Sequence, residues 1–88
     1  MIESRTTRQF REAFASLPEE IRQHARRAYG LFRADPHHAS LRFKKVDKES
    51  RVYSVRIGLG YRALGVLDGT TVVWFWIGSH ADCDRLLG

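Results

Sequence analysis

The chain has 88 residues, of which 15 are Lys or Arg and 10 are Asp or Glu, so its formal net charge is +5. This length allows one domain, predicted to span residues 1–88, with one modest core. Hydrophobic residues make up 43% of the chain and aromatic residues 11%, which is enough apolar surface to exclude intrinsic disorder. The longest apolar run covers residues 72–77, whereas a membrane span needs about twenty residues. We therefore expect no membrane partner and, because the N-terminus does not resemble a signal peptide, a cytoplasmic protein.

A single cysteine, Cys83, and four histidines limit the redox and metal chemistry of the chain. One cysteine cannot form an internal disulfide, which is typical of cytoplasmic proteins. His37 and His38 stand together like a metal pair, but they follow a predicted helix end and no third ligand has a suitable spacing. We therefore predict no metal site and no cofactor.

The excess positive charge is concentrated in one stretch. Residues 42–62 carry seven Lys or Arg against two acidic residues, whereas the rest of the chain has eight residues of each sign and is neutral. Such a concentration of charge attracts polyanions. Nucleic acid is the leading candidate and an acidic protein is the other, beside a solvated basic surface that has no dedicated ligand. The seven residues are Arg42, Lys44, Lys45, Lys48, Arg51, Arg56 and Arg62.

Two helices are predicted in the first third of the chain. Phe10, Phe14 and Leu17 recur at helical spacing and predict a short helix. Residues 18–34 predict a second helix, because an apolar stripe runs along one side and Asp35-Pro36 then stops it. The stripe consists of Ile21, Ala25, Ala28, Tyr29 and Phe32.

The middle of the chain changes to the alternation that is typical of strands. Leu41 and Phe43 alternate with basic residues and predict a half-buried strand. Tyr53, Val55 and Ile57 alternate with polar residues and predict the next strand.

The last third of the chain predicts two further strands and a helix. Glycines at 58 and 60 favour a hairpin turn, which leaves residues 61–67 as the return strand. Asp68-Gly69 is a second hairpin signal, and the apolar residues 71–78 predict a strand at the centre of the sheet. Ser79 is the expected N-cap of a short helix that runs to Leu87.

Together these elements predict an α+β fold. A helical hairpin packs on one face of a four-stranded, mainly antiparallel sheet, which has five strands if residues 2–6 form another, and a short helix follows the sheet. The helices cover the face that includes Val55. The opposite, open face then carries Ser54, Arg56 and Arg62, so the basic stretch lies on the sheet.

Five segments, taken together in their order along the chain, carry a resemblance to a known family. They are residues 17–32, Leu41-Arg42-Phe43-Lys44, Tyr53-Ser54-Val55-Arg56-Ile57, the Tyr61-Arg62 pair after a glycine turn, and residues 74–80 before a short helix. In these segments the chain resembles, over nearly its whole length, the RelE/ParE family of toxins from bacterial type II toxin–antitoxin pairs.

The resemblance implies one of three activities. One branch of the family consists of ribosome-dependent endoribonucleases that cut mRNA and block translation, without a metal. The other branch inhibits DNA gyrase on the same fold, and a degenerate member would only bind its antitoxin. The fold does not choose among them. In each case the implied partner is a cognate antitoxin, whose C-terminal segment wraps the toxin and meets the basic stretch with acidic residues.

For the ribonuclease branch, the resemblance implies that Arg56, Arg62 and His80 form the catalytic set. Arg62 would bind the phosphate through its guanidinium, with help from Arg56. His80 would transfer protons, because histidine titrates near neutral pH. The other basic residues would bind the RNA backbone, and Lys45 could also join the chemistry. They are Arg42, Lys44, Lys45, Lys48 and Arg51.

Two positions depart from the family pattern. The family often has a second basic residue two positions before Arg56, where this chain has Ser54. It commonly has a tyrosine in the C-terminal segment, near the position of Cys83. Both departures favour the gyrase-inhibiting or degenerate alternatives. The concentration of charge at residues 42–62, together with His80, favours the metal-independent, ribosome-dependent endoribonuclease, which is the activity we predict.

Plainer structural roles are open for the same residues. Arg62 could pair with Asp82 or Asp84, and His80 could cap the last helix. The aromatic run at 74–76 could stack bases, although aromatic residues on an inner strand are more typical of a core.

Overall fold

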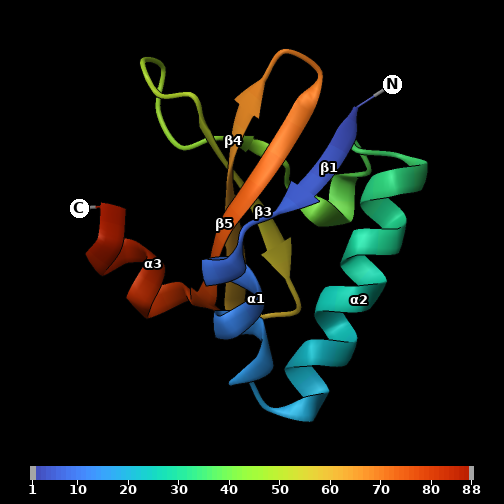
Figure 1. Cartoon of the computed structure of the whole chain (residues 1–88), viewed down its shortest axis with the longest axis vertical. Coiled ribbons are helices and arrows are strands. Elements are labelled where there is room, and N and C mark those ends of the chain that lie inside the picture. Colours follow the sequence, from blue (N-terminus) through green and yellow to red (C-terminus); the bar gives the residue numbers. More distant parts are fainter. Residues whose placement is uncertain (1, 88) are drawn as a thin grey trace.

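The computed structural model describes residues 2–87 and combines helices with one five-stranded sheet (Figure 1). This confirms the predicted α+β fold, including the strand near the N-terminus. In chain order the elements are β1 (Glu3–Thr6), α1 (Arg8–Ala15), α2 (Glu19–Ala34), the 3₁₀ turn η1 (Ala39–Leu41), β2 (Lys44–Lys45), β3 (Val52–Ile57), β4 (Tyr61–Asp68), β5 (Thr71–Ser79) and α3 (His80–Leu87).

The strands are ordered β1-β5-β4-β3-β2. β1 runs parallel to β5, and the other neighbouring pairs are antiparallel. The prediction that β5 is the central strand is wrong, because β4 occupies the middle of the sheet. β1 pairs only with residues 71–74, so the second half of β5 forms an edge. Gly58 and Gly69 have φ angles of +60° and +62°, as the two hairpin turns require.

Both predicted helices are present, although α1 ends at Ala15, before Leu17, and Pro18 precedes α2 instead of starting it. Thr7 caps α1, because its Oγ1 accepts a hydrogen bond from the backbone N–H of Phe10 at 3.1 Å. α2 ends at Ala34, directly before Asp35-Pro36. Phe32 of α2 is buried and meets Trp74 of β5 edge to face, with ring centroids 5.4 Å apart. This contact fixes α2 against the sheet.

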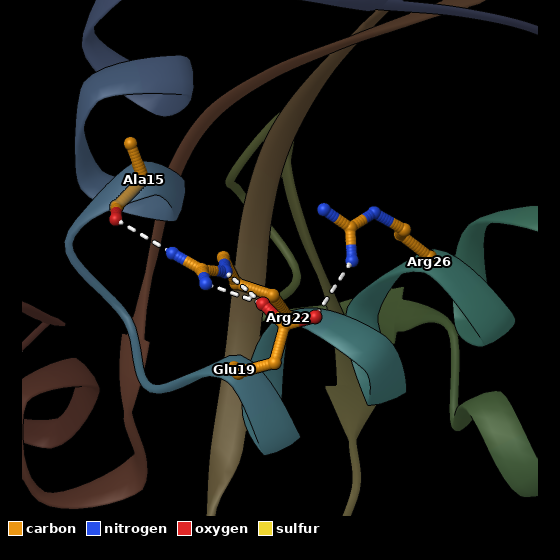
Figure 2. A network of polar contacts seen from close by, with 4 residues as sticks. All are labelled: Ala15, Glu19, Arg22 and Arg26. Atoms are coloured by element: carbon orange, nitrogen blue, oxygen red, sulfur yellow. Dashed lines mark hydrogen bonds and ion pairs between the residues drawn. The ribbon is translucent and has the colours of Figure 1, made fainter.

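A network of charged side chains crosses the turn between the two helices. Glu19 accepts hydrogen bonds from Arg22 and lies 3.7 Å from Arg26, while Nη1 of Arg22 donates to the carbonyl of Ala15 at 3.1 Å (Figure 2). The guanidinium of Arg22 accordingly lowers the pKa of the Glu19 carboxyl. These arginines are therefore engaged at the helical hairpin, away from the open face of the sheet.

The core lies between the helices and the face of the sheet that the sequence predicted. Val55, Ala63 and Ile77 lie opposite one another across β3, β4 and β5, and all three are buried. The complete buried cluster consists of Ala25, Phe32, Leu41, Val55, Ile57, Ala63, Val72, Trp74 and Ile77. The helices leave a cleft of about 440 Å³ beside this core, bordered by Phe10 and Arg11 of α1 and by Arg26 and Tyr29 of α2.

The predicted strand through Leu41 and Phe43 is wrong. Residues 39–41 form a 3₁₀ turn, and Arg42 then takes a left-handed conformation with φ +49°. This turn sends the side chain of Leu41 into the core and ends the alternation on which the prediction rested. Only Lys44 and Lys45 pair with β3.

The expectation that the second face of the sheet is open is also corrected. Ser79 caps α3 by accepting from the backbone N–H of Asp82 at 3.1 Å, as predicted. The helix then lies against β4 and β5 and buries Cys83 to 2% exposure. Leu64, on the face away from α1 and α2, is 0% exposed. α3 therefore covers part of this face.

Candidate functional site

Strand pairing brings three basic side chains to one face of the sheet. Arg56 of β3 lies opposite Arg62 of β4, and Ser54 lies between Lys44 of β2 and Leu64 of β4. Directly opposed residues share a face, and residues two apart on a strand do so as well. Lys44, Ser54, Arg56 and Arg62 therefore lie together on the side away from α1 and α2. We call this surface the basic face.

Arg62 is half-buried, and its guanidinium makes a hydrogen bond but no ion pair within the described part of the chain. Its Nη1 lies 3.4 Å from Oγ of Ser54, a long contact with a neutral acceptor. The structural alternative, a pair with Asp82 or Asp84, is not what the structure shows. Asp82 pairs with Arg85, and Asp84 pairs with His80.

Arg56 is directed toward the turn that joins β3 and β4. Its Nε donates to the carbonyl oxygen of Gly58 at 2.9 Å, and the side chain is half-buried. This bond leaves the terminal nitrogens of the guanidinium as further donors. Arg56 and Arg62 thus supply two positive charges side by side, on rigid strands.

Cys83 of α3 is buried and lies close enough to Arg62 for the guanidinium to influence its thiol. Burial raises the pKa of the Cys83 thiol, the positive charge of Arg62 opposes that rise, and Asp84 adds to it. A buried thiol that stays protonated is a poor nucleophile. The thiol is therefore a packing group beside the basic face, in the region where the family pattern led us to expect a tyrosine.

His80 lies at the start of α3, next to the turn that leads into β4. Its backbone N–H donates to the carbonyl of Gly60 at 2.7 Å, and its Nε2 lies 3.5 Å from Oδ2 of Asp84. The ring is half exposed. The described contacts join it to Asp84 and not to Arg56 or Arg62, so a substrate would have to bridge the histidine and the arginines.

The five predicted RNA-binding residues are all exposed, but they do not form one compact cluster. Lys44 shares the basic face, whereas Lys45 lies opposite Tyr53 at the edge of the sheet. Arg51 is 3.6 Å from Asp68 in an exposed pair that contributes little stability. Arg42 and Lys48 lie in the segments on either side of β2.

Sequence periodicity missed the position of Trp76. Trp74 is buried in the core, but a bulge between Leu64 and Gly65 shifts the register, so that Trp76 lies opposite Leu64 and Trp74 opposite Gly65. The two tryptophans therefore lie on different faces. The one sequence signal that could have indicated this is Gly65, because a glycine within a strand often accompanies a bulge.

Residues 2–87 contain no group of three or more His, Cys, Asp or Glu side chains able to hold a metal ion. None of the helices in this part of the chain has the length and apolar character of a membrane span. The basic face offers the guanidinium groups of Arg56 and Arg62 and the ammonium group of Lys44, and the imidazole of His80 lies at the start of α3. Such groups bind phosphate and transfer protons.

Comparison with solved structures gives three informative relatives. The RelBE2 toxin–antitoxin complex from Mycobacterium tuberculosis matches with a TM-score of 0.70 and 26% identity, over 90% of this chain and 98% of that chain. The RelB-RelE antitoxin–toxin complex from Methanococcus jannaschii matches with a TM-score of 0.71 and 15% identity, over 96% and 99% of the two chains. YafQ from Escherichia coli matches over 100% of both chains, with a TM-score of 0.73 and 11% identity. The last two likenesses show the fold alone.

Comparison with curated protein sequences gives no match. A family model for the ParE-like toxin domain, however, matches residues 19–84, from the start of α2 into α3. This range includes every basic residue of the candidate site and His80. The chain therefore belongs to the family of ParE-like toxin domains, as its resemblance to RelE/ParE toxins predicted.

Proposed function

We propose that this toxin-family protein cuts mRNA on the ribosome and is held inactive by a cognate antitoxin. The observation that carries the proposal is Arg62, a half-buried guanidinium that has no carboxylate partner in the described part of the chain and lies beside Arg56. A guanidinium placed in this way is ready to bind a phosphate. The fold shared with a RelBE toxin–antitoxin complex supports the same assignment.

RNA can be cut by its own 2′-hydroxyl. The 2′-oxygen attacks the adjacent phosphorus and loses its proton to a base, while the 5′-oxygen leaves and accepts a proton. Arg62 binds the phosphate oxygens and stabilises the charge that builds up on them in the transition state, and Arg56 assists. His80 exchanges the proton, with its ring oriented by Asp84. The nucleophile belongs to the substrate, so the protein has to supply only phosphate binding and proton transfer.

Binding of the RNA backbone is assigned to the exposed basic residues around β2. Lys44 lies on the basic face itself, Lys45 follows it on the edge strand β2, and Arg42, Lys48 and Arg51 lie in the segments on either side of β2. Contacts of this kind position a strand without reading its sequence, and they weaken steeply as salt increases. They also suit an acidic antitoxin segment, which would cover the basic face and exclude the RNA.

The test is induced expression without the antitoxin, with growth measured and the 5′ ends of cellular mRNA mapped. We expect growth arrest with new, codon-phased 5′ ends, and loss of both in Arg62→Ala and His80→Ala. Arg8→Ala is the matched control, because Arg8 is exposed on α1 and pairs with Glu12, away from the basic face. The proposal fails if Arg62→Ala and His80→Ala arrest growth and cut mRNA as the unchanged protein does.

A second candidate is inhibition of DNA gyrase, or antitoxin binding alone. It is favoured by Ser54, which is buried where a second basic residue is expected, and by the buried thiol of Cys83. Gyrase inhibition predicts growth arrest with DNA damage and intact mRNA. A module that only binds antitoxin predicts no arrest from soluble, folded protein.

A further inference from the structure

The two tryptophans of β5 occupy very different environments. Trp74 is 4% exposed, its Nε1 donates to Oγ of Ser4 at 2.7 Å, and its ring packs against Phe32. Trp76 is half-buried on the basic face, opposite Leu64. Within the described part of the chain, no hydrogen bond or aromatic contact engages its indole. Trp74 is thus a core residue, and Trp76 has no equivalent structural partner.

The indole of Trp76 covers Gly78, which places it next to Arg62. A Cβ atom on Gly78 would lie 2.6 Å from Cζ2 and 2.8 Å from Cη2 of Trp76, so only glycine leaves room for the ring. Gly78 lies directly opposite Arg62 on β4. The ring therefore lies over Gly78, and Gly78 is the neighbour of Arg62, to which we assign phosphate binding.

A cleft of about 670 Å³ borders Trp76 at the free edge of β5. It exists because β1 stops pairing at Trp74, so that α3 and the turn after α1 form the walls of the cleft instead of another strand. Leu17 and Leu86 line it with apolar surface, and Ser79 and the ion pair of Arg85 with Asp82 line it with polar groups. A space of this size falls within the range of ligand pockets.

We propose that Trp76 is a base-stacking residue, and that this cleft receives the nucleobase next to the phosphate bound by Arg62. The inference rests on the proposed function, because it takes RNA as the ligand of the basic face. An indole stacks on any base through its π surface, and the neighbouring guanidinium holds the phosphate in register. A peptide could also fill an apolar cleft, but the positive charge beside the ring favours a polyanion.

The probe is a single-stranded 2′-O-methyl RNA hexanucleotide, which cannot be cut because its 2′-oxygens are blocked. In the full-length Trp74→Phe protein, Trp76 is the only tryptophan, so its fluorescence reports on its surroundings alone. We expect saturable quenching as the RNA binds. In the parent protein, Trp76→Leu should lower RNA affinity by roughly 5- to 150-fold, the range measured for loss of one stacked base. Trp76→Phe, which keeps an aromatic ring, should retain most of the affinity.

The outcomes separate this inference from the proposed function. If Trp76→Leu binds the RNA as tightly as the parent while Arg62→Ala binds weakly, RNA is the ligand but no base stacks on Trp76, and the inference is wrong. A response of Trp76 fluorescence to poly-glutamate but not to RNA makes the cleft a peptide groove and also overturns it. If the parent protein does not bind RNA at all and Arg62→Ala remains toxic, the proposed function fails as well. Equal melting temperatures of Trp76→Leu and Trp76→Phe exclude misfolding as the cause of a difference.

Discussion

At the residue scale, the buried thiol of Cys83 reports on how tightly α3 covers the basic face. The thiol is 2% exposed and its pKa is raised chiefly by burial. The protonated thiol therefore makes its full contribution to the free energy of unfolding when the pH is below the pKa of the thiol in the unfolded chain. This contribution is lost as pH rises through the higher pKa of the folded state.

We expect iodoacetamide to label Cys83 slowly in the folded protein at neutral pH and rapidly in denaturant, because alkylation requires an accessible thiolate. Stability measured by urea unfolding should fall as pH rises above about 9. The fall should be smaller in Cys83→Ser, which also checks that labelling is specific. Labelling of the native protein at the denatured rate would contradict the buried position of the thiol.

The candidate site could be predicted only in part at this scale. Simple alternation placed Arg56 and Arg62 on one face, because both belong to regularly paired strands. The same alternation would put Trp74 and Trp76 on one face as well. The bulge on β5 separates them, and it arises from tertiary pairing with β4 rather than from any pattern in β5 itself.

At the scale of elements, α3 depends on its cap. The eight-residue helix is short, and an isolated helix of this length is not stable. The hydrogen bond from the backbone of Asp82 to Oγ of Ser79 and the burial of Cys83 hold it on the sheet. Loosening of α3 would therefore expose Cys83 and the surface of β4 and β5 that the helix covers.

Ser79→Ala should lower the free energy of unfolding by about 1 kcal/mol, within the usual range for loss of an N-cap. It should also speed the labelling of Cys83, because α3 frays before the rest of the chain unfolds. Thr7→Ala is the matched control: it removes the equivalent cap of α1 and should cost a similar amount without changing Cys83 labelling. Equal labelling rates in the two variants would show that α3 does not open separately.

Elements with strong start and stop signals were predicted well, whereas η1 and β2 were not. α2 follows Pro18 and ends before Asp35-Pro36, so its bounds are set by local chemistry. β2 has two residues, because the left-handed backbone of Arg42 redirects the chain. An arginine gives no local signal for that conformation, since it is tertiary burial of Leu41 that imposes it.

At the scale of the whole molecule, the interface between the sheet and the helices depends on close packing. α1 lies against β5 and α2 against β3, on one face of the sheet (Figure 1). Gly65 of β4 lies beneath this interface. A Cβ atom there would be 2.6 Å from Cγ1 of Val72 and 2.7 Å from Cε3 of Trp74. Val72 and Trp74 therefore leave no room for a side chain larger than that of glycine at position 65.

Gly65→Ala should lower the free energy of unfolding by about 1–3 kcal/mol, as expected for overpacking of a core. Gly30→Ala should instead stabilise the protein by up to about 1 kcal/mol, because Gly30 lies within α2 and a Cβ there meets nothing within 4 Å. Urea unfolding measures both. A neutral effect of Gly65→Ala would mean that the bulge of β5 relaxes to accept the methyl group.

The central claim, that Arg62 binds the phosphate of an RNA being cut, is tested most directly with purified ribosomes carrying a defined mRNA. Cleavage would be timed with the parent protein, Arg62→Ala, Arg62→Lys and the control Arg8→Ala. We expect Arg62→Ala to slow cleavage by roughly 10²- to 10³-fold, the usual effect of losing one transition-state donor. Arg62→Lys should be intermediate and Arg8→Ala unchanged. Cleavage by folded Arg62→Ala at the parent rate, or no cleavage by any of the proteins, would contradict the account.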